Sequence, residues 1–164
     1  MLDAAFVADC PYTPEALLFD EILEIDAAAG RVVARMPTHD QLPFTALQRA
    51  HPERHPRHVS GAVMVHVTAM LGLAHAYFVL GLRHREGWIG YGTHIDGARY
   101  GRLARIGPPL ELECRATQVR RIRGATYVRY AFRFEQEGQV VYESRQGAVF
   151  HRVASGSPGA APAP

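Results

Sequence analysis

Histidines are concentrated in one short stretch of the chain, "HPERHPRHVSGAVMVHVTAM", which covers residues 51–70. It holds four of the nine histidines: His51, His55, His58 and His66. An imidazole changes its charge near neutral pH, so two histidines in opposite protonation states could act as the base and the acid of a proton-transfer reaction. We therefore take His51, His58 and His66 as candidate catalytic residues. The alternatives are a packed, hydrogen-bonded helix residue for His66 and solvated loop residues for the other two.

The spacing of the loop histidines also raises the question of a metal site. His51, His55 and His58 could hold zinc together if their segment were helical. Pro52 and Pro56 interrupt such a helix, and no cysteine or carboxylate is spaced to complete the ligand set. We therefore expect no metal.

The histidine-rich stretch leads into an uncharged apolar segment, residues 59–82. About 20 apolar residues suffice to cross a bilayer, but His66, Thr68 and His75 lie inside this segment and would be costly in hydrocarbon. The segment therefore predicts the buried central helix of a folded domain, with no membrane span. Because His75 lies nine residues after His66, it falls on the opposite helix face and is expected to be structural.

The start of this helix offers a second kind of chemistry. Ser60 precedes the apolar run and is expected to cap the helix rather than to act as a nucleophile. The backbone N–H groups near Ser60, Gly61 and Ala62 point out of a positive helix end, which suits a carbonyl oxygen that gains negative charge during a reaction.

The segments around the helix read as β-strands. In "YVRYAFRFE" and "LELECRA", apolar and polar residues alternate with the period of a sheet that has one wet face. Gly124 and the "EQEGQ" segment predict hairpin turns, the second of which leads into a last strand, "VVYESRQGAVFHRV". Earlier, "LFDEILEID" and "GRVVARMP" predict a hairpin, and "GWIGYGTHIDGARYGRL" predicts a strand whose glycines indicate a bend or bulge.

The element order indicates an α+β domain in which an antiparallel sheet wraps around one long central helix. We assign residues 1–153 to this single domain. Residues 154–164 are too poor in apolar side chains to pack and are predicted to be disordered. Such a sheet leaves an edge strand that needs covering, so we expect a homodimer, with a higher assembly of dimers as an option.

Composition narrows the class of protein. All 18 basic residues are arginine, and with 16 acidic residues the net charge is only +2, which argues against a general nucleic-acid binder. Cys10 and Cys114 lie far apart and suggest no disulfide framework. Because the first residues also lack the features of a secretory signal, we expect a cytoplasmic protein.

Taken together, several segments resemble the hotdog-fold acyl-thioester enzymes, and most closely the 3-hydroxyacyl-acyl-carrier-protein dehydratases. The similar segments, in order, are "PYTPEALLFDEILEID", "VSGAVMVHVTAMLG", "HIDGARYGRLARIGPPLELEC" and "FEQEGQVVYES". In that family a loop histidine and a helix carboxylate from different subunits act as base and acid. Here His51 lies one residue from the loop position, and His66 occupies the carboxylate position.

The resemblance implies an enzyme of fatty-acid or polyketide metabolism, a lyase that dehydrates a 3-hydroxyacyl thioester or hydrates an enoyl thioester. No cofactor is expected beyond the carrier of the substrate, either coenzyme A or the phosphopantetheine of an acyl-carrier protein. A thioesterase is the alternative activity, and a non-catalytic acyl-binding protein is a second alternative. Discriminating evidence would be free thiol for the thioesterase and acyl binding without product for the binding protein.

Two further sets of residues are assigned on weaker grounds. Tyr91, His94 and Tyr100 lie on the strand after the helix, where the acyl tunnel of the family would pass, and are candidate substrate-binding residues together with Ser60, Gly61 and Ala62. Three arginines, Arg120, Arg121 and Arg123, could meet the phosphates of coenzyme A or the acidic surface of an acyl-carrier protein. A solvated hairpin end is the alternative for these arginines.

Overall fold

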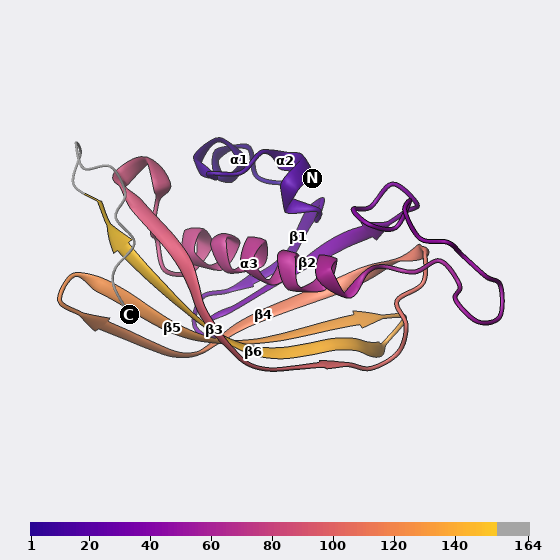
Figure 1. Ribbon diagram of the computed structural model, residues 1–164. Helices are drawn as coiled ribbons and strands as arrows, with labels where there is room; N and C mark the ends of the chain where they lie inside the picture. The colour runs from indigo at the N-terminus through magenta and orange to yellow at the C-terminus, as the bar shows by residue number, and fades with distance from the viewer. Residues whose placement is uncertain (154–164) are drawn as a thin grey trace.

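One six-stranded antiparallel sheet curls around a single long helix in the computed structural model, which describes residues 1–153 (Figure 1). The strand order is β1-β2-β4-β5-β6-β3, and each neighbouring pair is antiparallel. The strands are β1 Glu21–Asp26, β2 Arg31–Thr38, β3 Trp88–Tyr100, β4 Gly107–Ile122, β5 Ala125–Gln136 and β6 Gln139–Arg152. This is the predicted α+β hotdog architecture. The prediction for residues 154–164 lies outside the described residues.

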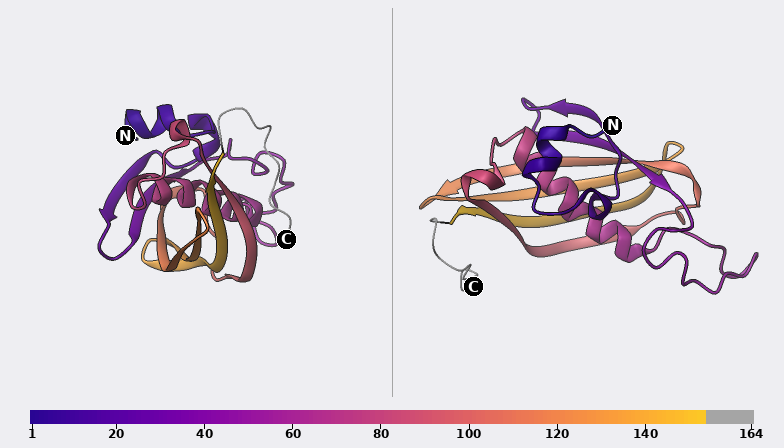
Figure 2. Two further views of the ribbon diagram at one scale, coloured as in Figure 1. Left: turned by 90° about the vertical axis from the view of Figure 1, so that its left-hand side faces the viewer. Right: turned by 90° about the horizontal axis from the view of Figure 1, so that it is seen from above.

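The central helix α3, Gly61–Phe78, lies across the concave face of the sheet (Figure 2). Ser60 is its N-cap, as predicted, and its Oγ accepts a hydrogen bond from the Ala62 N–H at 3.3 Å. Within residues 1–153, α3 is the one helix long and apolar enough to cross a membrane. Most of it is buried inside the fold, so α3 is the core helix.

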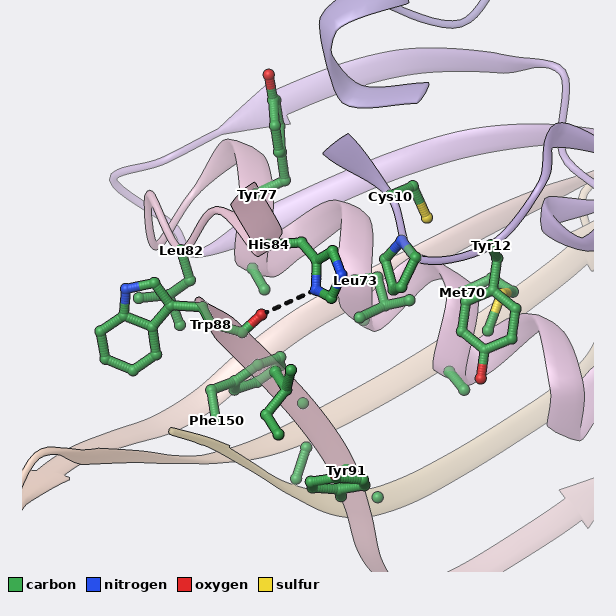
Figure 3. Close-up of a pocket in the computed structure, with 18 of the residues that line it drawn as sticks. Cys10, Tyr12, Met70, Leu73, Tyr77, Leu82, His84, Trp88, Tyr91 and Phe150 are labelled. Carbon is green, nitrogen blue, oxygen red and sulfur yellow. Dashed lines mark hydrogen bonds between the residues drawn. The ribbon is translucent and has the colours of Figure 1, made fainter. Parts of the chain in front are cut away.

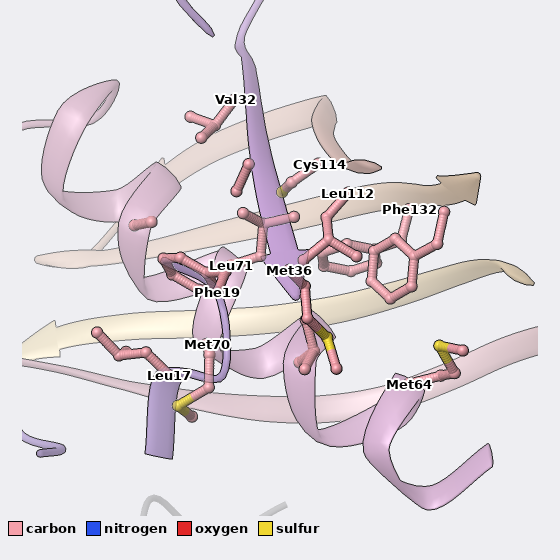
Figure 4. Packing of buried hydrophobic residues seen from close by; sticks show 14 of the residues in the cluster. Leu17, Phe19, Val32, Met36, Met64, Met70, Leu71, Leu112, Cys114 and Phe132 are labelled. Carbon is pink, nitrogen blue, oxygen red and sulfur yellow. The ribbon is translucent and has the colours of Figure 1, made fainter. Parts of the chain in front are cut away.

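The hydrophobic core fills the space between α3 and the sheet (Figure 4). Leu71 of α3, Met36 of β2 and Leu112 of β4 are all fully buried. The predicted alternation holds on β5, where Phe132 and Phe134 are buried, whereas Arg129 and Arg133 are exposed. The period-two pattern therefore located the inner face of the sheet correctly.

Two short hairpin turns set the register of the last three sequential strands. Arg123 and Gly124 join β4 to β5, and Glu137 and Gly138 join β5 to β6, with φ angles between +50° and +81° at these four residues. Positive φ at both turn residues matches the right-handed twist of the flanking strands, and glycine adopts it at no steric cost. Both predicted turns are confirmed.

Three short helical elements were not expected from the sequence. They are α1 Ala4–Asp9, α2 Pro14–Leu17 and the 3₁₀ helix η1 His84–Glu86. Helices α1 and α2 lie on the side of α3 that faces away from the sheet (Figure 1). The first strand begins at Glu21 rather than at the predicted Leu18, because Leu18 adopts a left-handed conformation (φ 63°) that ends α2.

Strand β3 is irregular, as its glycines predicted. Its pairing with β6 shifts register between Gly92 and His94 and again between Ile95 and Gly97. Strand β3 forms one edge of the sheet, and β1 forms the other. The β3 edge is 13 residues long, whereas the β1 edge has only six residues and carries Glu21, Glu24 and Asp26.

Candidate functional site

The main cavity lies between α3, strands β3 and β6, and the segment that follows α1 (Figure 3). Its volume is about 580 Å³, within the usual range of small-molecule sites. Most of its walls are aromatic or aliphatic, including Phe6, Met70, Tyr77, Trp88 and Phe150. A cavity of this kind suits an apolar group attached to a polar carrier.

A pair of uncharged polar side chains, Thr68 of α3 and Gln146 of β6, forms the polar end of this cavity. The Gln146 Nε2 lies 2.9 Å from the Thr68 Oγ1, and the Thr68 hydroxyl lies 2.6 Å from the Val65 carbonyl, to which it donates. The Gln146 Nε2 also lies 3.0 Å from the Ser144 Oγ. The helix and the sheet are therefore bridged by a small polar network that borders an apolar cavity.

Tyr142 lies beside this network, two residues before Ser144 on the inner face of β6. It is fully buried, and its hydroxyl is the one buried side-chain polar atom without a hydrogen-bond partner in the described part of the chain. Burial raises the pKa of Tyr142, which keeps the hydroxyl protonated and able to donate. The hydroxyl is thus a free donor near Ser144 and Gln146. Because a buried donor without a partner costs free energy, a bound ligand that accepts from it would be stabilised.

The opposite end of the cavity is closed by a contact between α1 and η1. The buried Asp9 carboxylate accepts hydrogen bonds from the backbone N–H groups of His84 at 2.8 Å and Arg85 at 3.0 Å. Cys10 lies beside it on the cavity wall, and burial raises the pKa of its thiol, so the thiol stays protonated near neutral pH. Asp9 thus holds the N-terminal segment against the cavity, and Cys10 is no ready nucleophile.

His75 is a structural residue, as predicted from its place on the helix. It is completely buried, its Nε2 lies 3.1 Å from the Gly30 carbonyl, and its Nδ1 lies 3.1 Å from the Tyr130 hydroxyl. Burial lowers the pKa of His75 to about 4 and raises that of Tyr130 well above its usual value. The neutral imidazole therefore donates from Nε2 to Gly30 and accepts at Nδ1 from Tyr130, which satisfies both ring nitrogens.

His66 lies on another face of α3 and borders a second cavity of about 450 Å³. Its Nε2 is 2.6 Å from the carbonyl oxygen of Ala16 in α2, so the ring ties α2 to the central helix. The walls of this second cavity come from α2, the start of α3 and the segment around Phe44. His66 is absent from the walls of the main cavity.

The two loop histidines are bonded within their own segment. The Nδ1 of His51 accepts from the backbone N–H groups of Glu53 and Arg54, at 3.3 and 3.1 Å. The Nδ1 of His58 lies 2.8 Å from the Pro56 carbonyl. Neither residue lines either cavity, and the chain does not bring them together with His66 in one pocket. Over residues 1–153, no cluster of three or more His, Cys, Asp or Glu side chains is arranged to hold a metal ion.

The first turn of α3 is covered by an aromatic ring. Tyr100 of β3 lies against Gly61, where an added Cβ would come within 3.0 Å of the ring, and the Tyr100 hydroxyl donates to the Gly61 carbonyl at 3.3 Å. Ala62 is exposed and borders the second cavity. Two of the predicted substrate-binding residues, Gly61 and Tyr100, are thus in direct contact.

The other predicted binding residues are spread along β3 and the far hairpin. Tyr91 borders the main cavity and stacks on His151, with ring centroids 5.7 Å apart. His94 is half-exposed and lies 3.5 Å from the Asp96 carboxylate. The arginines at positions 120, 121 and 123 lie at the β4–β5 hairpin, at the end of the molecule opposite to the loop before α3 (Figure 1).

Sequence reasoning missed the Thr68–Gln146 pair. In the sequence, Thr68 is only a polar residue inside the apolar helix, and Gln146 is one residue of a predicted strand. The alternation of that strand was a usable signal, because it places Tyr142, Ser144 and Gln146 on the same face as the buried Phe150.

Comparison with known proteins supports the fold and leaves the activity open. No family model matches the chain, and no curated protein matches it. Among solved structures, a mutant of a thioesterase from Pseudomonas aeruginosa is similar with a TM-score of 0.61 and 16% identity, over 91% of this chain and 93% of that one. A phenylacetic acid degradation-related protein from Ralstonia eutropha gives 0.58 and 20%, over 88% and 96%. A thioesterase from Haemophilus influenzae gives 0.56 and 20%, over 87% and 85%.

Proposed function

We propose that the protein hydrolyses acyl thioesters. The observation that carries this proposal is the apolar cavity of about 580 Å³ that ends at the Thr68–Gln146 pair, beneath an edge strand of the sheet. Two of the similar structures, from Pseudomonas aeruginosa and Haemophilus influenzae, are of thioesterases, which supports the same activity class. The thioesterase alternative from the sequence thus has more support than the dehydratase.

The substrate lies along the groove between α3 and β3 in this proposal. The acyl group occupies the apolar cavity, with its far end near Trp88, and the thioester lies at the Thr68–Gln146 end. The carrier arm, from coenzyme A or an acyl-carrier protein, extends over the inner face of β3. Ile95 and Tyr100 on this face are 50% and 56% exposed and would cover the arm.

Thr68 and Gln146 act as positioning residues for hydrolysis. The Gln146 carboxamide can accept a hydrogen bond from a water molecule through Oε1 while its Nε2 stays bonded to Thr68. Holding water next to the thioester carbonyl supplies the orientation that a bimolecular attack lacks. The water oxygen forms a bond to the acyl carbon, the carbon–sulfur bond breaks, and the products are a carboxylic acid and a thiol that takes a proton from the water.

Dehydration remains the weaker proposal because it needs an acid and a base near one β-hydroxyacyl group. The carboxylate position of the resemblance is His66, whose Nε2 is occupied by the Ala16 carbonyl. His51 and His58 bond to backbone groups of their own loop. An acid–base pair would therefore need these bonds to break or a second subunit to rearrange them.

The edge strand β3 is the basis for proposing a homodimer. Its 13 residues pair with β6 on one side only, and an edge of this length with few charges is a strong template for another strand. Two copies related by a twofold axis would join their β3 strands antiparallel into one continuous sheet. That axis would bring the β4–β5 hairpin of the second copy to the Gly61 end of the first. Arg120, Arg121 and Arg123 could there meet the phosphates of the carrier.

A second candidate function is acyl binding without turnover. It is favoured by one observation: Thr68 and Gln146 are both uncharged, so neither can take a proton from water as a base at neutral pH. In that case the same cavity would hold an acyl thioester as a cargo.

One incubation separates the candidates. The purified protein is mixed with saturated, 3-hydroxyacyl and 2-enoyl thioesters of coenzyme A and of an acyl-carrier protein, while free thiol and enoyl absorbance are followed together. We expect thiol release from the saturated substrates. Interconversion of hydroxyacyl and enoyl forms without thiol would support the dehydratase instead. Binding with neither product would support the cargo function.

A further inference from the structure

Two glycines on opposite walls of the main cavity have empty space where their side chains would be. Gly72 of α3 and Gly92 of β3 both line the cavity, and a Cβ built on either one has no atom within 4 Å apart from its immediate surroundings in the chain. Neither residue has a positive φ angle. The backbone therefore does not require glycine at either position, and other residues would fit without strain.

Other glycines beside the same cavity have a different reason to be glycine. A Cβ on Gly90 would lie 2.4 Å from Cε1 of Phe150, and one on Gly147 would lie 2.2 Å from Cε1 of His94. Gly90 and Gly147 are thus needed for packing. Gly72, in contrast, lies in the middle of an 18-residue helix, where glycine is the least favourable residue apart from proline.

Gly72 and Gly92 lie at the same depth in the cavity. Gly72 follows Thr68 by four residues, about 6 Å along the helix. Gly92 pairs with Ala148, which follows Gln146 by two strand residues, about 6.8 Å along β6. Both glycines therefore lie one step beyond the Thr68–Gln146 pair, where neither of them adds a side chain to the cavity and the neighbouring Ala148 adds only a methyl group.

We propose that Gly72 and Gly92 are specificity-determining residues that set the width of the cavity next to the thioester. The inference rests on the proposed function, because it takes the Thr68–Gln146 end as the place of the thioester. The two glycines admit acyl groups with a branch or a ring near the carbonyl, in addition to straight chains. A side chain at either position would leave room for the straight chain and exclude the wider group.

The test measures binding rather than turnover. The probes are 2-oxoalkyl thioethers of coenzyme A, which keep a carbonyl but cannot be hydrolysed, with either a straight hexyl or a cyclohexylmethyl group. Each CH₂ group of the ring that a new side chain keeps out of the cavity should lower the affinity for the ring-bearing probe about fourfold. We expect about that loss in Gly72→Ala and a larger one in Gly92→Val, with Gly92→Ala as the replacement if the valine variant fails to fold. The straight probe should bind within about twofold of its original affinity in both variants.

Gly97→Ala is the matched control. Gly97 also lies on β3 with open space before it, but it pairs with Arg145 on the other face of the sheet and does not line the cavity. This variant should bind both probes as the parent does. The Gly72→Ala variant should also melt about 3 °C higher, since alanine favours the helix, which separates loss of binding from loss of folding.

The outcomes distinguish this inference from the proposed reaction. Equal loss of both probes, or no loss of either, in folded Gly72→Ala and Gly92→Val would overturn the role of the glycines even if the parent protein releases thiol. The predicted selectivity in a protein that releases no thiol would support the glycines and contradict hydrolysis. A parent that binds neither probe would overturn the role of the glycines, and one that also releases no thiol would overturn the proposed reaction as well.

Discussion

Polar residues on different faces of helix α3 make two different kinds of contact. His66 and His75 each place Nε2 against the backbone carbonyl of a distant segment, Ala16 for the first and Gly30 for the second. Thr68 instead bonds to its own helix and to the side chain of Gln146, and this pair faces a cavity. The histidines therefore hold the fold together, whereas the less conspicuous pair lies where a ligand has access.

This contrast changes the reading of the sequence. A histidine in a sequence suggests catalysis because its charge changes near neutral pH. His75 instead stays neutral in the core, where its two ring nitrogens bond to Gly30 and Tyr130. Threonine and glutamine carry no charge, yet they supply donors and acceptors beside an apolar space, which is the usual composition of a binding site. Helix α3 thus has structural faces, which carry His66 and His75, and a ligand-binding side, which carries Thr68.

The largest effect is expected on stability when His75 is replaced. The change His75→Leu would leave the Tyr130 hydroxyl and the Gly30 carbonyl without their buried partner. Each unpaired buried group costs about 1–3 kcal/mol, so we expect the free energy of unfolding to fall by about 4 kcal/mol in urea titrations. Thiol release per folded molecule should change little. A variant as stable as the parent would show that these bonds do not hold the core.

Acid should weaken the fold through the same residue. The pKa of His75 is about 4 in the folded protein, below the usual 6.5, so the unfolded chain binds more protons as the pH falls through this window. The free energy of unfolding should therefore drop by about 3 kcal/mol between pH 6.5 and pH 4, and no further below it through this group. Urea titrations at several pH values test this. His75→Leu, which lacks the imidazole, should lose that part of the pH dependence.

A smaller effect is expected for His66. The change His66→Leu removes one hydrogen bond to the Ala16 carbonyl at a partly exposed place. The free energy of unfolding should fall by about 1 kcal/mol, because a typical intramolecular hydrogen bond contributes about that much. The melting temperature and hydrogen exchange in α2 measure this loss. An unchanged α2 together with lost thiol release would instead place His66 in the reaction.

Much of the fold could be predicted because it depends on local patterns. Phe132 and Arg133 show the two faces of one strand, and the uncharged run after Ser60 indicates the central helix, most of which is buried. The short helices were missed because four to six residues are too few for a periodic pattern to appear. Their positions depend on tertiary contacts, such as the bond from His66 to Ala16, that join residues 50 positions apart.

The site was harder to predict for a related reason. Thr68 and Gln146 are 78 positions apart, and neither residue type marks itself as reactive. The strand pattern could place Gln146 on the inner face, but only the packing of α3 decides which helix residue lies opposite to it. Histidines are indeed concentrated before and within α3. Their hydrogen-bond partners, however, are backbone carbonyl and N–H groups, which a sequence does not reveal.

The most direct test is thiol release from a saturated acyl-coenzyme A by Gln146→Leu and His66→Leu, measured side by side with their melting temperatures. Loss of a group that orients the attacking water costs about a hundredfold in kcat. We expect that loss in Gln146→Leu with the fold retained, and a rate within about twofold of the parent in His66→Leu. Full activity in Gln146→Leu together with an inactive, folded His66→Leu would contradict the assignment of the reaction to the Thr68–Gln146 side of the helix.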